Sequence, residues 1–265
     1  MVAEPKSMDN VTMAERRLLF IYAHPDDESF GVAGLARMHA DLGARVALVT
    51  ATRGDAGRAG EPPMCDHSEL PARREAELHE AARVLGIQHV TLLDYLDKHL
   101  ADAPSDKIRR ELVVVIRRHR PQIVVTFDPN GANQHPDHVA ISRFASDSIA
   151  AAADPRWYPD AGAAHRVQRL LWGSPVMPWE APKSPDLAGE AGIDFLIDIS
   201  KYRETKAAAL RAHRTQHVSI DRHFFHLPDV DRILSVETFR QAFGPPLSKR
   251  PASDIFESIV DGHRL

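Results

Sequence analysis

Short apolar runs alternate with helix-like segments over the first half of the chain, and this alternation limits the fold more than any other feature. Residues 18–23, LLFIYA, are apolar throughout, which is typical of a strand buried on both faces of a sheet. The expected elements are strands at 18–23, 46–51, 89–93 and 122–127 and helices at 30–42, 72–85 and 106–118. This order predicts an α/β, Rossmann-like three-layer fold, with a mainly parallel sheet and helices on both faces.

The second half of the chain is less regular. The elements expected there are a helix from Asp137 to about Ala153, strands at 170–172 and 195–199, and a helix at 202–212. Residues 179–192 contain prolines and glycines, so we expect a long surface loop. We predict a flexible N-terminal tail at 1–17 and a single domain at 18–265 whose C-terminal third is more irregular.

Composition excludes several classes of protein. A single cysteine, Cys65, permits no intrachain disulfide and no thiolate zinc site, so any metal must be held by imidazole and carboxylate groups. The net charge of -4 favours neither nucleic acid nor an anionic membrane as a partner. The polar first seventeen residues do not resemble a signal peptide, and no apolar stretch approaches the ~20 residues that span a bilayer. We therefore expect a cytoplasmic protein; whether it forms a homo-oligomer stays open.

A cluster of polar side chains follows the first predicted strand, at residues 24–28, His-Pro-Asp-Asp-Glu. Open α/β sheets place their ligand sites at the carboxyl ends of strands, where this cluster lies. Carboxylates at a helix N-terminus are also stabilised by the helix dipole, which would explain the acids without a ligand. That explanation does not account for the histidine at position 24.

A second cluster, DPNGANQHPDH at residues 128–138, follows the fourth predicted strand. Asp137 would also serve as a helix N-cap, and either histidine would be unremarkable as a solvated loop residue. In a doubly wound sheet whose order reverses beside the first strand, however, the first and fourth strands are neighbours. Both clusters would then face one crevice, where imidazole and carboxylate groups favour a metal site.

Several blocks of the sequence carry a resemblance to a known family. They read LLFIYAHPDDESFG, LVTATRGDAG, RREAELHEAARVLGI, VVTFDPNGANQHPDH and KAAALRAHRTQ, and they span residues 18–216. Together they resemble the LmbE-like, PIG-L family of metal-dependent deacetylases. The resemblance implies removal of acetyl groups from N-acetylglucosamine-linked substrates, among them precursors of mycothiol and bacillithiol and glycosylphosphatidylinositol intermediates.

The resemblance also implies roles for individual residues. The metal ligands would be His24, Asp27 and His138, with Asp26 as general base. His135 would stabilise the oxyanion and assist the leaving amine, and Asp137 would orient His135 and raise its basicity.

Two imidazoles and one carboxylate leave an open position on Zn²⁺, as a hydrolytic site requires. The same ligands suit Fe²⁺, which the sequence does not exclude. An iron oxygenase, however, would leave Asp26 without a task.

Other matches bear on substrate binding. Arg74 and His213 lie in blocks that the family places near its pocket, and residues 58–70 are expected to form a loop that covers the site. Two departures concern the pocket. The Gly-Tyr-Gly run of many relatives is replaced by residues 132–134, Ala-Asn-Gln, where Asn133 could donate a hydrogen bond, and the Pro-Asp-Gly run is replaced by residues 94–98. The reaction is therefore better specified than the substrate.

The sequence thus predicts a zinc-dependent hydrolase that removes an acetyl group from a small N-acetylglucosamine-containing glycoside or amino sugar. One alternative is an amidase that cleaves a larger amide conjugate. Another is a non-catalytic relative that binds a metal or a sugar. A nucleotide-binding module is disfavoured, because no Gly-x-Gly-x-x-Gly follows the first strand and the acids of residues 26–28 would repel phosphates.

Overall fold

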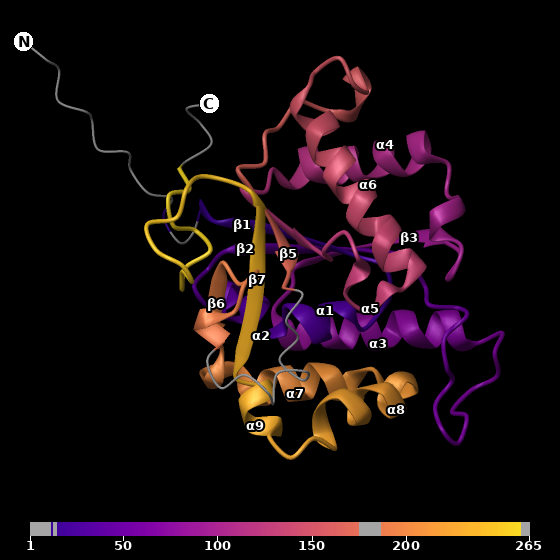
Figure 1. Cartoon of the computed structure of the whole chain (residues 1–265). Coiled ribbons are helices and arrows are strands. Elements are labelled where there is room, and N and C mark those ends of the chain that lie inside the picture. Colours follow the sequence, from indigo (N-terminus) through magenta and orange to yellow (C-terminus); the bar gives the residue numbers. More distant parts are fainter. Residues whose placement is uncertain (1–11, 13–14, 175–186, 261–265) are drawn as a thin grey trace, which may run out of the picture.

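The computed structural model describes residues 12, 15–174 and 187–260, and a seven-stranded sheet runs through this part of the chain (Figure 1). The strands are β1 (Arg17–Tyr22), β2 (Arg45–Thr52), β3 (His89–Tyr95), β4 (Ile123–Thr126), β5 (Arg169–Gly173), β6 (Phe195–Asp198) and β7 (Val236–Phe243). Their order is β3-β2-β1-β4-β5-β7-β6. The first five strands are parallel, and β7 is antiparallel to both β5 and β6.

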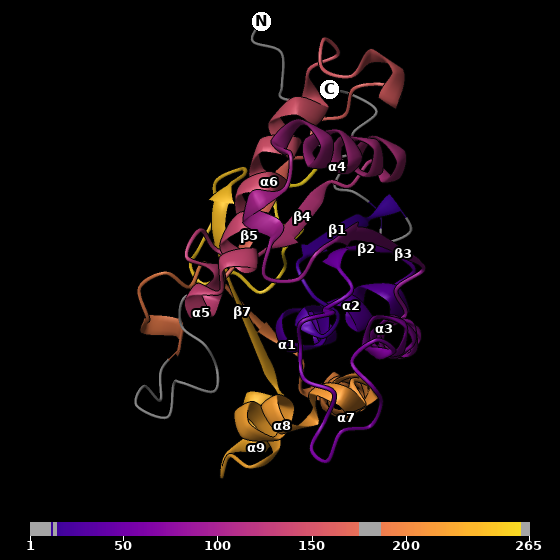
Figure 2. The ribbon, with the colours of Figure 1, turned by 90° about the vertical axis from the view of Figure 1, so that its right-hand side faces the viewer.

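Helices cover both faces of the sheet, as Figure 2 shows. They are α1 (Asp27–Gly31), α2 (Ala33–Asp41), α3 (Leu70–Leu85), α4 (Ser105–His119), α5 (Gly131–Gln134), α6 (Pro136–Ala153), α7 (Arg203–Ala212), α8 (His217–Ile220) and α9 (Val230–Ile233). Helices α4 and α6 lie on one face, whereas α2 and α3 lie on the other, with α7 packed against them. The predicted three-layer α/β fold is confirmed.

The sheet separates two apolar cores, and β1 contributes to both. Leu18, Phe20 and Tyr22 pack into the core beneath α2 and α3. Leu19 and Ile21 point the other way, into the core beneath α4 and α6. Successive side chains of a strand alternate between faces, so a strand covered on both sides must be apolar throughout. Burial of each such side chain is worth about 1.5–3 kcal/mol.

Among the differences from the sequence-based expectation are one helix and one strand. The helix expected at 30–42 begins earlier, at Asp27, and is interrupted at Val32, whose φ of -139° is not helical. Strand β7 was missed, because VETFRQAF carries polar side chains at half its positions and has no continuous apolar run. None of the described helices is both long enough and apolar enough to cross a membrane.

The expected N-terminal tail and the expected long loop lie mostly outside the residues that the structure describes. Residues 1–11, 13–14 and 175–186 lie outside the described part, so the predictions for a flexible tail and for most of the long loop concern residues that are not described. The boundary of the tail is corrected, because Arg17 already begins β1 and the buried side chain of Arg16 pairs with Asp254 at 3.2 Å. The single domain remains a prediction.

The strand order reverses at β1, since β2 and β3 are added on one side of it and β4 and β5 on the other. It pairs with β2 on one side and with β4 on the other, both in parallel. Because the two parallel strands β1 and β4 end at the same edge, the segments that follow them, residues 23–28 and 127–138, meet there. The expected adjacency of the first and fourth strands is confirmed.

Candidate active site

The turn after β1 places three acidic side chains in succession. Asp26 has φ 125° and ψ -28°, a conformation that L-residues rarely adopt and that costs about 1–3 kcal/mol. The turn is held by Asp27, whose Oδ2 accepts hydrogen bonds from the amides of His24 at 2.8 Å and Ala23 at 3.2 Å. The Asp27 carboxylate is thereby oriented before any ligand binds.

The segment after β4 fixes His138. Its ring stacks on Phe127 with centroids 3.9 Å apart and planes 11° from parallel, and its Nδ1 lies 3.2 Å from the carbonyl oxygen of Gly131. Gly131 has φ +67°, and a Cβ there would lie 2.8 Å from the Cβ of His138, so glycine is needed for this close approach.

The two segments bring three predicted ligand side chains to one point. Nδ1 of His24 lies 3.1 Å from Nε2 of His138. The Asp27 carboxylate lies beside both, with Oδ2 3.7 Å from His24 Nδ1 and Oδ1 3.4 Å from His138 Nε2. All three side chains are buried.

The second nitrogen of each ring shows why a cation fits between them. His24 Nε2 lies 3.0 Å from Asp97 and 3.1 Å from Asp137, so it carries the hydrogen that these carboxylates accept. His138 Nδ1 likewise donates to the Gly131 carbonyl. The lone pairs of His24 Nδ1 and His138 Nε2 then face each other beside a carboxylate, and only a cation or a proton relieves their repulsion.

Two further groups of three residues in the described part of the chain have ligand atoms within 4.8 Å of one another: His24/His135/His138 and His24/Asp97/Asp137. His24 belongs to both. The first group overlaps the point described above. The second uses the opposite nitrogen of His24, where carboxylates that accept a hydrogen bond from a metal-binding histidine are usually found. We therefore place the candidate metal between His24 Nδ1, Asp27 and His138.

Negative charge accumulates around His24. Burial lowers its pKa, but hydrogen bonds to Asp137 and Asp97 outweigh burial and raise the pKa to about 10. For Asp97 the hydrogen bond from His24 overcomes burial and lowers the pKa to about 2. The surrounding carboxylates therefore favour a positive charge at His24, and a divalent cation meets the same electrostatic demand.

Asp26 lies beside Arg74. Arg74 Nη2 is 3.4 Å from Asp26 Oδ2, and the guanidinium also donates to the carbonyl oxygens of Gly54 and Pro25. Burial raises the pKa of Asp26 to about 6, against the opposing charge of Arg74. A carboxylate with this pKa can accept and release a proton near neutral pH.

His135 lies next to the candidate ligands, with its ring centroid 4.8 Å from that of His24. Its Nδ1 accepts the amide hydrogen of Asp137 at 3.3 Å, so the ring hydrogen of the neutral form is on Nε2. Burial, followed by the charges of His24 and His138, lowers the pKa of His135. The charge of Asp137 raises the pKa of His135 in the expected direction, but burial and the charges of His24 and His138 lower it by more.

Asp137 itself has a different partner from the one expected. Its carboxylate contacts His24 and accepts the amide hydrogens of Lys98 at 2.6 Å and Leu100 at 3.1 Å. It therefore orients a candidate metal ligand and not His135. Asp97, which the sequence reasoning assigned no role, acts on the same nitrogen. The only signal for Asp97 was its place in an altered loop after the third strand.

Two of the three residues predicted to bind substrate reach the site cavity. This cavity of about 360 Å³ is lined by Arg74 and Asn133, and also by His24, Asp26, Asp27, Asp97, His135 and His138. Asn133 is exposed, and its Oδ1 accepts the amide hydrogen of His135 at 3.1 Å.

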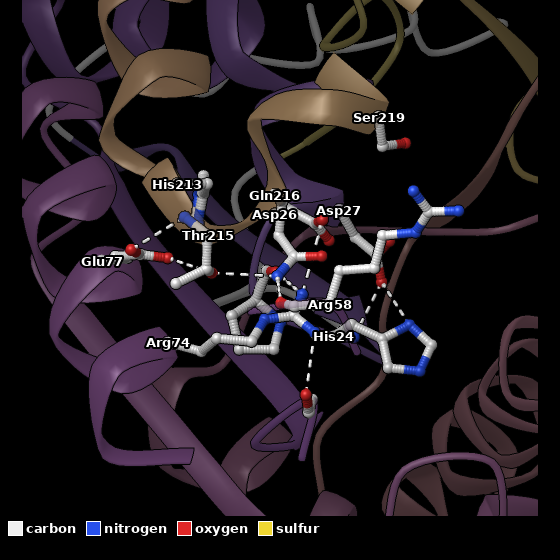
Figure 3. Close-up of polar contacts among 12 residues, drawn as sticks. His24, Asp26, Asp27, Arg58, Arg74, Glu77, His213, Thr215, Gln216 and Ser219 are labelled. Carbon is white, nitrogen blue, oxygen red and sulfur yellow. Dashed lines mark hydrogen bonds and ion pairs between the residues drawn. The ribbon is translucent and has the colours of Figure 1, made fainter. Parts of the chain in front are cut away.

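His213 is fully buried and does not line this cavity. Figure 3 shows His213 to one side of Asp26, and its burial outside the cavity corrects the expectation that it contacts substrate.

The rest of the cavity wall comes from the C-terminal third of the chain and from the turn after β2. Gly57 and Ala56 line it on the side of that turn, and Lys206 and Glu237 line it from α7 and β7. Lys206 and Glu237 form a buried ion pair of 2.8 Å. The wall formed by Glu237 was not identifiable from the sequence, because strand β7 was not predicted.

Several named relatives match this chain over most of its length. The model of the PIG-L family, described as GlcNAc-PI de-N-acetylase, matches residues 19–149. A 1D-myo-inositol 2-acetamido-2-deoxy-alpha-D-glucopyranoside deacetylase of Streptomyces avermitilis is 31% identical, and the match covers 94% of this chain and 99% of that protein. A protein of the same name from Thermobispora bispora is 33% identical, with 96% and 97% covered.

Solved structures agree on the fold. A conserved protein of Thermus thermophilus superimposes with a TM-score of 0.66 at 26% identity, covering 88% of this chain and 97% of that one. The N,N'-diacetylchitobiose deacetylase of Pyrococcus horikoshii gives a TM-score of 0.67 at 24% identity, covering 85% and 83%. With relatives above 30% identity matched over nearly their whole length, the chain belongs to the PIG-L, LmbE-like family.

Proposed function

We propose that this chain is a zinc-dependent N-deacetylase that hydrolyses the acetamide of a small N-acetylglucosamine-containing glycoside. The observation that carries the proposal is the convergence of His24 Nδ1, His138 Nε2 and the Asp27 carboxylate within 3.7 Å, in a cavity that the carboxylate of Asp26, the proposed general base, also lines. The names of the relatives support the same reaction on an inositol glycoside of N-acetylglucosamine.

The donor set fits Zn²⁺, with two imidazoles and one carboxylate held in place by second partners. When bound, the ion would polarise the amide carbonyl and lower the pKa of a water towards ~7. Fe²⁺ accepts the same donors, and we choose zinc because the reaction is hydrolytic.

The protein's own groups carry the proton transfers. Asp26, whose pKa of about 6 lies near neutrality, accepts the proton of the attacking water. Arg74 Nη2 holds that carboxylate at 3.4 Å. His135 Nε2–H is a donor for the developing oxyanion or for the leaving amine, because its Nδ1 is already occupied by the Asp137 amide.

The substrate would lie in the cavity between the metal ligands and the C-terminal wall. Arg74 and Asn133, which line the cavity, are the proposed contacts for sugar hydroxyl groups. Residues 132–134 contain no tyrosine, so we assign polarisation of the carbonyl to the metal and His135. The cytoplasmic location, the covering role of residues 58–70 and the oligomeric state stay predictions.

The test is acetate release by purified protein of known metal content. We expect release from the inositol glycoside of N-acetylglucosamine, loss of activity after chelation, and recovery with Zn²⁺. His138→Ala should lose metal and activity, whereas His99→Ala, an exposed histidine outside the cavity lining, should keep both. Full metal content and full activity in His138→Ala would refute the assignment. Activity only on larger amides would favour the amidase alternative.

A further inference from the structure

Glu28 is a fully buried carboxylate that the proposed reaction does not use. Its Oε2 accepts the amide hydrogen of Asp26 at 3.2 Å. Its Oε1 accepts the hydroxyl hydrogen of Ser29 at 2.6 Å and lies 2.7 Å from Nε2 of His213. Both Glu28 and His213 have no accessible surface, and neither lines the site cavity.

The hydrogen bond to the amide of Asp26 is made where the backbone is strained. Asp26 is not glycine, yet its φ is 125°, so the turn must be held by its surroundings. The amides of Ser29 and Phe30 donate to the Asp26 carbonyl oxygen at 2.9 and 3.1 Å, which secures one side of the residue. Glu28 secures the other side, through the amide.

His213 belongs to a segment whose side chains reach three different parts of the site. In Figure 3, His213, Thr215 and Gln216 lie near Asp26, with His213 and Thr215 above Arg74 in this view. Thr215 binds Glu77 of α3 through both its amide, at 3.0 Å, and its hydroxyl, at 2.7 Å. Gln216 Nε2 donates to the carbonyl oxygen of Arg58 at 2.7 Å. The segment is therefore fixed independently of Glu28, and His213 presents a fixed donor to the Glu28 carboxylate.

We propose that Glu28 and His213 form a positioning pair that holds Asp26 in its strained conformation and so aims its carboxylate at the reacting water. The inference rests on the proposed function of Asp26 as general base. It assigns His213 a role through Asp26 and not through the substrate. A carboxylate is needed at position 28 because one acidic side chain must accept hydrogen bonds from Asp26, Ser29 and His213 together.

This role predicts a specific kinetic signature. Without the pair, the Asp26 backbone can relax to an ordinary φ, and its carboxylate moves away from the water. The rate of the chemical step should fall, because misplacement of a catalytic group by about 1 Å costs up to ~100-fold. Neither the metal ligands nor the cavity wall includes Glu28 or His213, so KM and metal content should remain those of the wild type.

The experiment compares three variants at the pair with one control. Glu28→Gln keeps the shape but replaces one acceptor oxygen with a donor, and His213→Leu removes the donor. His213→Gln retains an NH₂ group near the position of Nε2 and should restore kcat by about 10-fold or more relative to His213→Leu. The control is Arg117→Met, which removes a buried cation that donates to backbone carbonyls of the 151–158 region, away from the cavity.

For each protein, kcat, KM, zinc content and Tm are measured. We expect Glu28→Gln and His213→Leu to lose kcat at unchanged KM and zinc content, whereas Arg117→Met loses Tm but keeps kcat. A raised KM, a loss of zinc, or an equal loss of kcat in Arg117→Met would overturn the proposal.

Crystal structures separate this inference from the proposed function. If the pair positions Asp26, its φ is positive in the wild type and in His213→Gln but moves to the ordinary negative region in His213→Leu and Glu28→Gln. A positive φ in all four proteins would overturn the inference even if the wild type is an active deacetylase. An inactive wild type with full zinc content would refute the proposed function, while the four φ values would still decide the inference.

Discussion

The carboxylate of Asp137 accepts a hydrogen bond from His24, 113 residues earlier in the chain, at 3.1 Å. The imidazole of His135, two residues away, accepts a hydrogen bond from the backbone amide of Asp137 and not from its carboxyl group. Asp97 shares the same nitrogen of His24 at 3.0 Å. His24, Asp97 and Asp137 therefore resemble the carboxylate–histidine arrangement that orients metal ligands. In that arrangement the carboxylate sets the tautomer of the histidine and raises the donor strength of its ring.

Removal of these carboxylates should weaken metal binding. Asp137→Asn and Asp97→Asn are each expected to lower zinc affinity by about 10- to 100-fold, because His24 loses the partner that fixes its orientation. Competition with a chromogenic chelator measures the affinity. Asp160→Asn, which removes an exposed carboxylate paired with Arg110, is the control. Unchanged zinc affinity in both site variants would contradict the role assigned to them.

Gly57 lies against the guanidinium that holds Asp26. A Cβ at Gly57 would be 2.5 Å from Nη1 of Arg74, closer than real contacts allow. Gly57→Ala should therefore displace Arg74 from Asp26 and lower kcat by about 10-fold or more. Steady-state acetate release measures the loss. Gly162→Ala, strained at φ +95° but away from the cavity, should lower Tm without a change in kcat. Equal kcat values in Gly57→Ala and the wild type would show that the contact between Arg74 and Asp26 does not contribute to catalysis.

The packing of α2 on the C-terminal third depends on Gly34. A Cβ there would lie 2.5 Å from the Cβ of the buried Ile199. Gly34→Ala should lower the free energy of unfolding by about 1–3 kcal/mol through overpacking, as measured by urea denaturation. In the double variant Gly34→Ala/Ile199→Ala, the loss should be smaller than the sum of the two single losses. Strict additivity would mean that the clash is absorbed elsewhere.

The buried His39 should make stability depend on pH. Burial, followed by the charge of Arg16, lowers its pKa from 6.5 to about 4, against the smaller opposing effect of Asp254. Between pH 6.5 and 4 the unfolded chain binds the proton that the folded protein excludes, so stability falls as pH decreases through this window. The full loss attributable to His39 is about 3 kcal/mol.

Substitution of His39 isolates its share of this dependence. Neither ring nitrogen of His39 has a hydrogen-bond partner in the described structure, so His39→Leu removes the titrating group without breaking such a bond. Urea unfolding at pH 7 and pH 5 should show a smaller decrease for His39→Leu than for the wild type. His165, whose pKa burial also lowers to about 4, should retain part of the decrease. Identical decreases in both proteins would be inconsistent with this assignment.

Local pattern was sufficient for the elements that surround β1. The unbroken apolar run predicted a strand covered on both faces, and the motifs at residues 24–28 and 128–138 were placed correctly at the ends of β1 and β4. Such features depend on neighbours in sequence or on a topological rule, so the sequence alone reveals them. Strand β7 was not found, since its polar side chains Glu237 and Gln241 are satisfied by Lys206 and Arg169, which only the fold brings near.

The sequence by itself therefore determined the architecture, the two motifs and their convergence at one edge of the sheet. Only the tertiary structure decided which atoms face each other: His24 turns Nε2 towards Asp97 and Asp137, and His213 crosses from the end of α7 to Glu28. The reason is physical. A histidine has two nitrogens and several rotamers, and the choice among them is made by buried hydrogen-bond partners up to 185 residues away.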